Sequence, residues 1–137
     1  MRAQPTKPTL TASGRFLDRL GIGLSVACWI HCVLLPVMVV ASPAFSGLLF
    51  ADAEFHIWLL ALILPTALIA FALGWLKHRN AKVLLLGGSG LTLIIAACLL
   101  GVWTDHSVLN ETMEKVLTSI GGSLLAFGHF RNLASSK

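Results

Sequence analysis

The chain has 137 residues, of which 56% are hydrophobic and only 12% charged, and its mean hydropathy is +0.84. Soluble domains carry about 25% charged residues, so this composition excludes a soluble protein. Four helices that cross a bilayer need about 20 residues each, and little chain then remains for a separate catalytic domain. We therefore predict a single membrane domain that is not an enzyme.

Long stretches without Asp, Glu, Lys or Arg predict four membrane spans. An apolar run of about 18 residues or more is typical of a transmembrane helix. Three uncharged runs reach this length, and the fourth does so if its flanking side chains extend to the interfaces. The predicted fold is an all-α, antiparallel four-helix bundle integral to the membrane, with spans at about 20–42, 56–76, 83–103 and 114–131.

The predicted membrane domain covers residues 14–132. Residues 1–13 are rich in Pro, Thr and Ser, show no periodicity and are predicted to be disordered, and residues 133–137 form a short tail. Small residues are frequent in the third and fourth spans, which favours close approach of helices in lipid. The pairs Gly87-Gly88 and Gly121-Gly122 are the clearest examples.

The positive charges predict the orientation. Nine of the ten cations lie on one side of the predicted bundle, and Lys115 is the exception; the nine are Arg2, Lys7, Arg15, Arg19, Lys77, Arg79, Lys82, Arg131 and Lys137. Cytoplasmic segments of membrane proteins carry the excess of Lys and Arg. We therefore predict that both termini are cytoplasmic (N-in/C-in) in a bacterial-type inner (plasma) membrane. The lipid bilayer accounts for the basic residues, and no nucleic-acid partner is expected.

Chemically informative residues lie in the first span, at Cys28-Trp29-Ile30-His31-Cys32. On a helix, Cys28, His31 and Cys32 fall within an arc of about 100° and share one face. A histidine within a membrane is costly and marks a functional site by default. Thiolates select soft ions and imidazole adds zinc and copper, whereas hard ions need oxygen ligands and no acidic residue lies inside a predicted span. The motif predicts a transported soft ion, Hg(II), Cu(I), Zn(II) or Cd(II), and no permanently bound cofactor.

Two further residues are weaker candidate ligands. Met38 lies seven residues after His31 on the same stripe, and His129 lies near the inner end of the fourth span, where it could be an exit ligand or an interfacial ring. Cys98 stands alone in the third span and is interpreted as packing.

Three other functions stay open. A membrane thiol oxidoreductase could use Cys28 and Cys32 as a redox pair, although Cβ atoms four residues apart on a helix are about 5 to 6 Å apart and a disulfide needs about 3.5 to 4.5 Å. A haem-binding bundle could use His31 and His129 as axial ligands. In a scaffold protein the cysteines would only pack.

The sequence resembles the MerC family of small four-span membrane proteins. The similarity runs from about Asp18 to Asn132, and it is carried by several short motifs: Asp18-Arg19-Leu20-Gly21, Cys28 to Cys32, Leu64-Pro65, Ala72-Leu73-Gly74-Trp75 with His78-Arg79, and Gly128-His129-Phe130-Arg131-Asn132. The resemblance implies uptake of Hg(II) from the outer side toward the cytoplasm, with Cys28 and Cys32 as the thiols that pass the ion.

Two features depart from the dedicated mercury carriers of that family. Those carriers have two residues between the thiols and a second cysteine pair in the cytoplasmic tail. Here three residues, including His31, separate Cys28 from Cys32, and the tail has no cysteine. Another soft metal therefore remains open as the substrate. A homo-oligomer and a cytoplasmic metal acceptor also remain open as partners.

Overall fold

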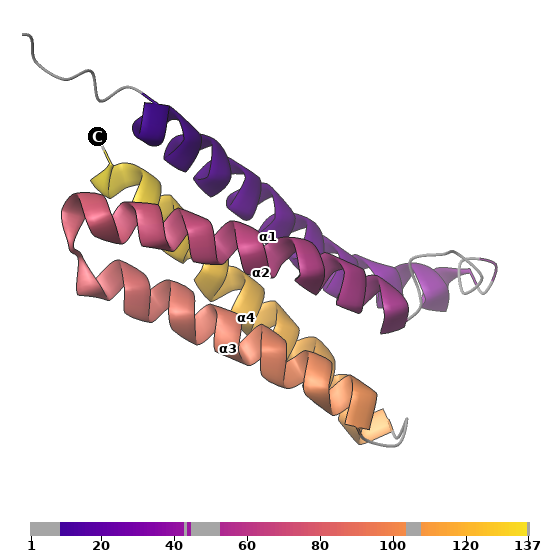
Figure 1. The fold of residues 1–137 in the computed structure, drawn as a ribbon. Coiled ribbons are helices and arrows are strands. Elements are labelled where there is room, and N and C mark those ends of the chain that lie inside the picture. Colours follow the sequence, from indigo (N-terminus) through magenta and orange to yellow (C-terminus); the bar gives the residue numbers. More distant parts are fainter. Residues whose placement is uncertain (1–8, 43, 45–52, 104–107, 137) are drawn as a thin grey trace, which may run out of the picture.

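The structure is a computed structural model that describes residues 9–42, 44, 53–103 and 108–136. It contains four helices, α1 (Thr9–Ala41), α2 (Ala53–His78), α3 (Ala81–Trp103) and α4 (Val108–Ser135). They pack lengthwise, and α2 turns directly into α3 (Figure 1). The all-helical, four-helix prediction is confirmed. Each predicted span falls on one helix, to within one residue at the end of α1.

The helices bury residues at alternating spacings of three and four. In α1 the buried positions are Asp18, Gly21, Ser25, Cys28 and Cys32, and in α3 they include Val83, Gly87, Gly90, Ile94 and Ala97. This spacing keeps one seam of each helix directed at its neighbours. Helices α2 and α4 each contact the other three helices, whereas no Cα atom of α1 lies within 8 Å of one of α3 among the described residues. Helices α2 and α4 therefore form the closer diagonal of the bundle, and α1 and α3 the wider one.

Glycine allows α3 and α4 to approach until their backbones touch. A Cβ atom on Gly90 would lie 2.7 Å from the carbonyl oxygen of Gly121, and one on Gly121 would lie 2.8 Å from the carbonyl oxygen of Gly90. Lipid provides no hydrophobic drive for helix association, so such close van der Waals contact is a main source of stability. Not every glycine contributes, since a Cβ on Gly88 would meet nothing within 4 Å.

Three helices are long and apolar enough to cross a membrane. The qualifying segments, found among the described residues, are Ala12–Leu34, Ile57–His78 and Ala81–Trp103. The described part of α4 does not qualify, because charged and polar side chains stand near both of its ends. The chain is thus a membrane protein with three apolar span candidates and a fourth, more polar helix packed against all of them.

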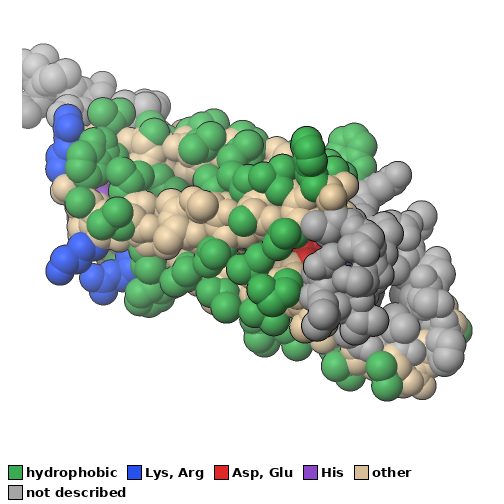
Figure 2. Space-filling view, turned by 90° about the horizontal axis from the view of Figure 1, so that it is seen from below, with side chains coloured by type: hydrophobic (Ala, Val, Ile, Leu, Met, Phe, Trp, Pro, Cys, Tyr) green, Lys and Arg blue, Asp and Glu red, His purple; other side chains and the backbone are tan. Residues whose placement is uncertain are grey.

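The outer surface of the bundle matches a lipid environment. Hydrophobic side chains are spread along the described part of the face seen in Figure 2, on both sides of a band of other side chains and backbone, and Lys and Arg gather at one end. Trp58 and Trp103 are 73% and 82% exposed, as expected for side chains in an interfacial aromatic belt. The α2–α3 turn and the end of α4 lie at the end rich in Lys and Arg. There, Lys77 of α2 donates a hydrogen bond to the backbone carbonyl of Ser136, just after α4.

The helices extend beyond the predicted spans at this end. Residues 9–13, assigned to the disordered segment by sequence, form the first turns of α1, and residues 1–8 lie outside the described part. Helix α4 likewise continues into the predicted tail as far as Ser135. The longer helices matter because Asp18 and Asn132, which flank the predicted spans, become part of the packed bundle.

Candidate functional site

The two cysteines of α1 lie in the bundle interior. Cys28 is 2% exposed and Cys32 is 7% exposed, and neither is in a disulfide. The two residues are one helical turn apart and share the interior face of α1. At 1.5 Å per residue, Cys28 lies about 15 Å along α1 from Asp18, well inside the apolar part of the bundle.

His31 and Met38 lie nearer the surface of α1 than the thiols do. The His31 side chain is half-buried and has interactions of its own, while Met38 is 37% exposed. The described residues contain no group of three or more His, Cys, Asp or Glu side chains that could hold a metal ion. A soft ion at this level would therefore draw on pairs of ligands.

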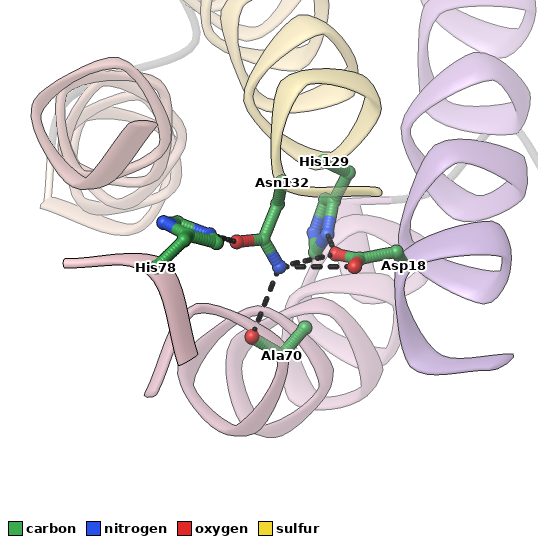
Figure 3. A network of polar contacts seen from close by, with 5 residues as sticks. All are labelled: Asp18, Ala70, His78, His129 and Asn132. Atoms are coloured by element: carbon green, nitrogen blue, oxygen red, sulfur yellow. Dashed lines mark hydrogen bonds and ion pairs between the residues drawn. The ribbon is translucent and has the colours of Figure 1, made fainter. Parts of the chain in front are cut away.

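A buried polar network connects the start of α1 with the ends of α2 and α4 (Figure 3). The Asp18 carboxylate accepts a hydrogen bond from His129 Nδ1 at 3.0 Å, and both of its oxygens accept from Asn132 Nδ2 at 2.9 Å. Asn132 also donates to the Ala70 carbonyl at 3.1 Å, and its own oxygen lies 2.8 Å from His78 Nε2. Asp18, His129 and Asn132 are each at most 1% exposed. We call these three residues and His78 the inner polar network.

Two glycines make room for the inner polar network. A Cβ on Gly21 would lie 2.4 Å from His129 Nε2, and a Cβ on Gly74 would lie even closer to the Asn132 side-chain oxygen. The His129 ring also stacks on Phe71 with a centroid distance of 4.5 Å. Any side chain at either glycine would displace the polar groups. The His129 and Asn132 side chains thus occupy the space that Cβ atoms would otherwise fill.

The hydrogen bonds of His78 identify its tautomer. Its Nδ1 accepts from the backbone N–H of Asn80 at 3.1 Å, so the proton is on Nε2, which donates to Asn132. Arg79, between His78 and Asn80, has a φ of 51°, a left-handed conformation that a tight turn can require. Asn80 then caps α3 by accepting from the backbone N–H of Lys82 at 3.1 Å. The turn thereby fixes the orientation of Asn132.

His129 retains one unused nitrogen. Its Nδ1 faces the carboxylate of Asp18, which places the proton there, and the buried Nε2 has no hydrogen-bond partner among the described residues. A histidine that donates one ring N–H to a carboxylate and offers the other nitrogen has the arrangement of most metal-binding histidines. Ser25, one turn beyond Gly21 on α1, also has a buried hydroxyl for which the described residues provide no hydrogen-bond partner.

The sequence predicts the thiols and His129 as candidate ligands, and it gives no indication that Asp18, Asn132 and His78 form a buried network with His129. Asp18 was placed outside the first span and its burial was not anticipated; the structure corrects this, because its carboxylate faces the bundle interior. The available signal was spacing: Asp18, Gly21, Ser25, Cys28 and Cys32 follow one another at intervals of three and four. His129 is not an exposed interfacial ring, since it is fully buried.

The fold and the site define a class of protein: a small helical membrane protein with a buried thiol pair and a buried polar network at the end rich in Lys and Arg. Residues 18–134 match the model of the MerC mercury resistance protein family, and the chain belongs to this family. Among curated proteins and among solved structures, none matches the chain. Membership in the family implies mercury-resistance transport across a membrane rather than catalysis.

Proposed function

We propose that the chain carries a soft metal ion, Hg(II) in the first place, across the inner membrane toward the cytoplasm through Cys28 and Cys32. The observation that carries the proposal is the pair of buried thiols one turn apart on the interior seam of α1. Soft ions prefer thiolate sulfur, and two thiolates neutralise a divalent ion, which lowers the cost of taking it into the bilayer. Two sulfur ligands in a linear arrangement are sufficient to bind Hg(II) tightly.

The proposed topology is an antiparallel bundle in which all four helices span the membrane and both termini are cytoplasmic. The gathering of Lys and Arg at one end supports it, because cytoplasmic ends are enriched in these residues. The more polar α4 is shielded by its contacts with the other three helices. The inner polar network then lies at the cytoplasmic end of the path.

His129 is the proposed inner ligand. Asp18 fixes its Nδ1 proton and leaves the Nε2 lone pair in the interior of the bundle. Gly21 adjoins this nitrogen, and Cys28 follows Gly21 by seven residues, or about 10 Å along α1. An ion that leaves the thiols toward the cytoplasm would meet His129 next. His31 and Met38, at the edge of the same stripe, are proposed as secondary ligands of the ion near the thiols.

The haem alternative is disfavoured by depth. His129 lies against Gly21, and His31 is ten residues, or about 15 Å, further along α1. Two axial ligands must flank one iron, so these two rings cannot share a haem in this fold.

Uptake by cells tests the proposal. Cells that express the wild-type chain without a reductase should accumulate Hg(II) and become more sensitive to it. The Cys28→Ser/Cys32→Ser variant should fall to the level of cells that lack the chain, because a hydroxyl does not bind a soft ion. The matched control is Ala27→Ser, which adds a hydroxyl at an exposed neighbour of Cys28 and should keep full uptake. Equal accumulation by wild type and the double variant, at equal amounts in the membrane, would exclude the thiol path.

The same comparison across metals tests the choice of ion. Hg(II), Cu(I), Zn(II) and Cd(II) should be supplied separately, with accumulation measured for wild type and the double variant. We expect the largest thiol-dependent difference for Hg(II). A larger one for another metal would reassign the substrate while leaving the thiol path in place.

A further inference from the structure

A small cavity lies beside Cys28 in the half of the bundle remote from the inner polar network. Its volume is about 10 Å³, and its polar lining consists of Cys28 from α1, Cys98 from α3, and Glu114 and Thr118 from α4. The remaining lining is aliphatic and comes from α2 and α3. A cavity of this size holds about one water-sized occupant. Two of the three thiols of the chain thus line the same interior space.

Glu114 is held over α3 beside Cys98. A Cβ on Gly101 would lie 2.8 Å from Glu114 Oε2, so the carboxylate rests directly on the backbone of α3. Gly101 follows Cys98 by three residues and therefore shares its helix face. Lining of the cavity and packing on Gly101 are separate observations, and both place this half-buried carboxylate at the thiol.

This arrangement suits a soft divalent cation. Two sulfurs from different helices can lie on opposite sides of one ion, whereas Cys28 and Cys32 start from the same helix. When the ion binds, two metal–sulfur bonds form, two S–H bonds break and two protons are released to water. The two thiolates balance the charge of the ion, and the Glu114 carboxylate attracts the cation before the thiols have bound it.

We propose that Cys28 and Cys98, with Glu114 beside them, form the loading site at which the ion enters the bundle. This inference rests on the proposed function and extends it, because Cys28 belongs to both thiol pairs. An ion held by Cys28 and Cys98 passes to Cys32 when the Cys32 sulfur loses its proton and bonds to the ion, while the Cys98 sulfur leaves the ion and takes up a proton. One metal–sulfur bond forms as another breaks, and the ion is never released into the apolar interior. Cys98 therefore takes part in transport, in contrast to the packing role expected from sequence.

Thiol counting on the purified, full-length chain tests the loading site. The Cys32→Ser variant retains only Cys28 and Cys98 and is placed in nanodiscs with one chain each, so that bridging between chains is prevented. One equivalent of Hg(II) should remove two thiols per chain from reaction with a maleimide. Cys32→Ser/Cys98→Ser should lose only one thiol and bind Hg(II) at least tenfold more weakly. Loss of only one thiol in Cys32→Ser would overturn the proposal.

Uptake tests the role of Glu114 without removing a thiol. Glu114→Gln should raise the Hg(II) concentration that gives half-maximal uptake by several-fold and leave the maximal rate unchanged. Gly101→Ala should act in the same direction, because its methyl group displaces the carboxylate. Gly88→Ala, at a position open to the outside, is the control and should behave as wild type. An unchanged half-maximal concentration in both Glu114→Gln and Gly101→Ala would remove Glu114 from the site.

The two proposals can fail independently. If uptake requires Cys28 and Cys32, but replacement of Cys98 changes neither the thiol count nor uptake, the loading site is wrong and the transport proposal stands. If Cys32→Ser loses two thiols to one Hg(II) but the Cys28→Ser/Cys32→Ser variant takes up Hg(II) like wild type, the site exists and the transport path lies elsewhere. Cys98→Ala serves as a second variant should Cys98→Ser fail to reach the membrane.

Discussion

Asp18 carries a carboxylate that is completely buried in a protein with few charges. Burial of an ionised carboxylate is costly unless it is paired and hydrogen-bonded, and here His129 and Asn132 provide the partners. Because these partners come from the far end of the sequence, the network joins the first helix to the last. The inner polar network therefore stabilises the closed bundle as well as placing His129.

Gly21→Ala should disturb this network selectively. The new methyl carbon would lie 2.4 Å from His129 Nε2, so the ring must move away from Asp18 or α1 must move away from α4. Overpacking of this kind costs about 1 to 3 kcal/mol, and we expect a lower midpoint of thermal unfolding in detergent. Gly23→Ala is the control on the same helix, since its Cβ would meet nothing within 4 Å. Equal stability of the two variants would contradict the described packing.

Single residues differed in how far sequence could predict them. Cys28 and Cys32 were identified because sulfur and imidazole are rare inside an apolar span and have a defined chemistry. Asp18 was not, because the apolar run begins only after Arg19, and no local pattern shows that a carboxylate has partners 111 and 114 positions away. Cys98 is interpreted as packing from sequence for the same reason: the other polar residues that line its cavity come from other helices.

At the scale of helices, the contact of α3 with α4 depends on two facing glycines. Gly121→Ala should separate them, because the added Cβ would lie 2.8 Å from the Gly90 carbonyl oxygen, a backbone atom that no rotamer change can move. We expect a loss of about 1 to 3 kcal/mol, measured as reduced resistance to denaturation in detergent. Gly88→Ala is the matched control on α3. A Gly121→Ala variant as stable as Gly88→Ala would refute backbone contact between these helices.

Helices were the most predictable part of the chain. Uncharged runs mark α1, α2 and α3 directly, since a bilayer accepts little else over that length. The ends were less predictable: residues 9–13 and the stretch up to Ser135 join the helices although their composition is polar. Tertiary contacts such as those of Asn132 extend a helix beyond its apolar part, and a pattern of hydropathy does not contain them.

For the whole molecule, the distribution of cations predicts which end faces the cytoplasm. A green fluorescent protein fused after Lys137 should fluoresce, and alkaline phosphatase at the same position should be inactive, because the first requires the cytoplasm and the second the periplasm. Exchange of Lys77, Arg79 and Lys82 for Gln should weaken this preference, since positive charge sets orientation. An active phosphatase fusion at Lys137 of the otherwise unchanged chain would contradict the proposed topology.

Contact of α4 with all three other helices bears on how the protein is assembled. Helices α1 to α3 are apolar enough to enter a bilayer on their own account, whereas α4 has the least apolar sequence of the four and places Thr118, His129 and Asn132 in the interior. These side chains would face lipid if α4 entered first or alone. Its order of synthesis suits this requirement, because α4 follows α1, α2 and α3 in the chain and can join these three partners once they are in the membrane. We therefore expect α4 to insert stably only after α1, α2 and α3 have assembled. The polar residues of α4 are tolerated only in the assembled bundle.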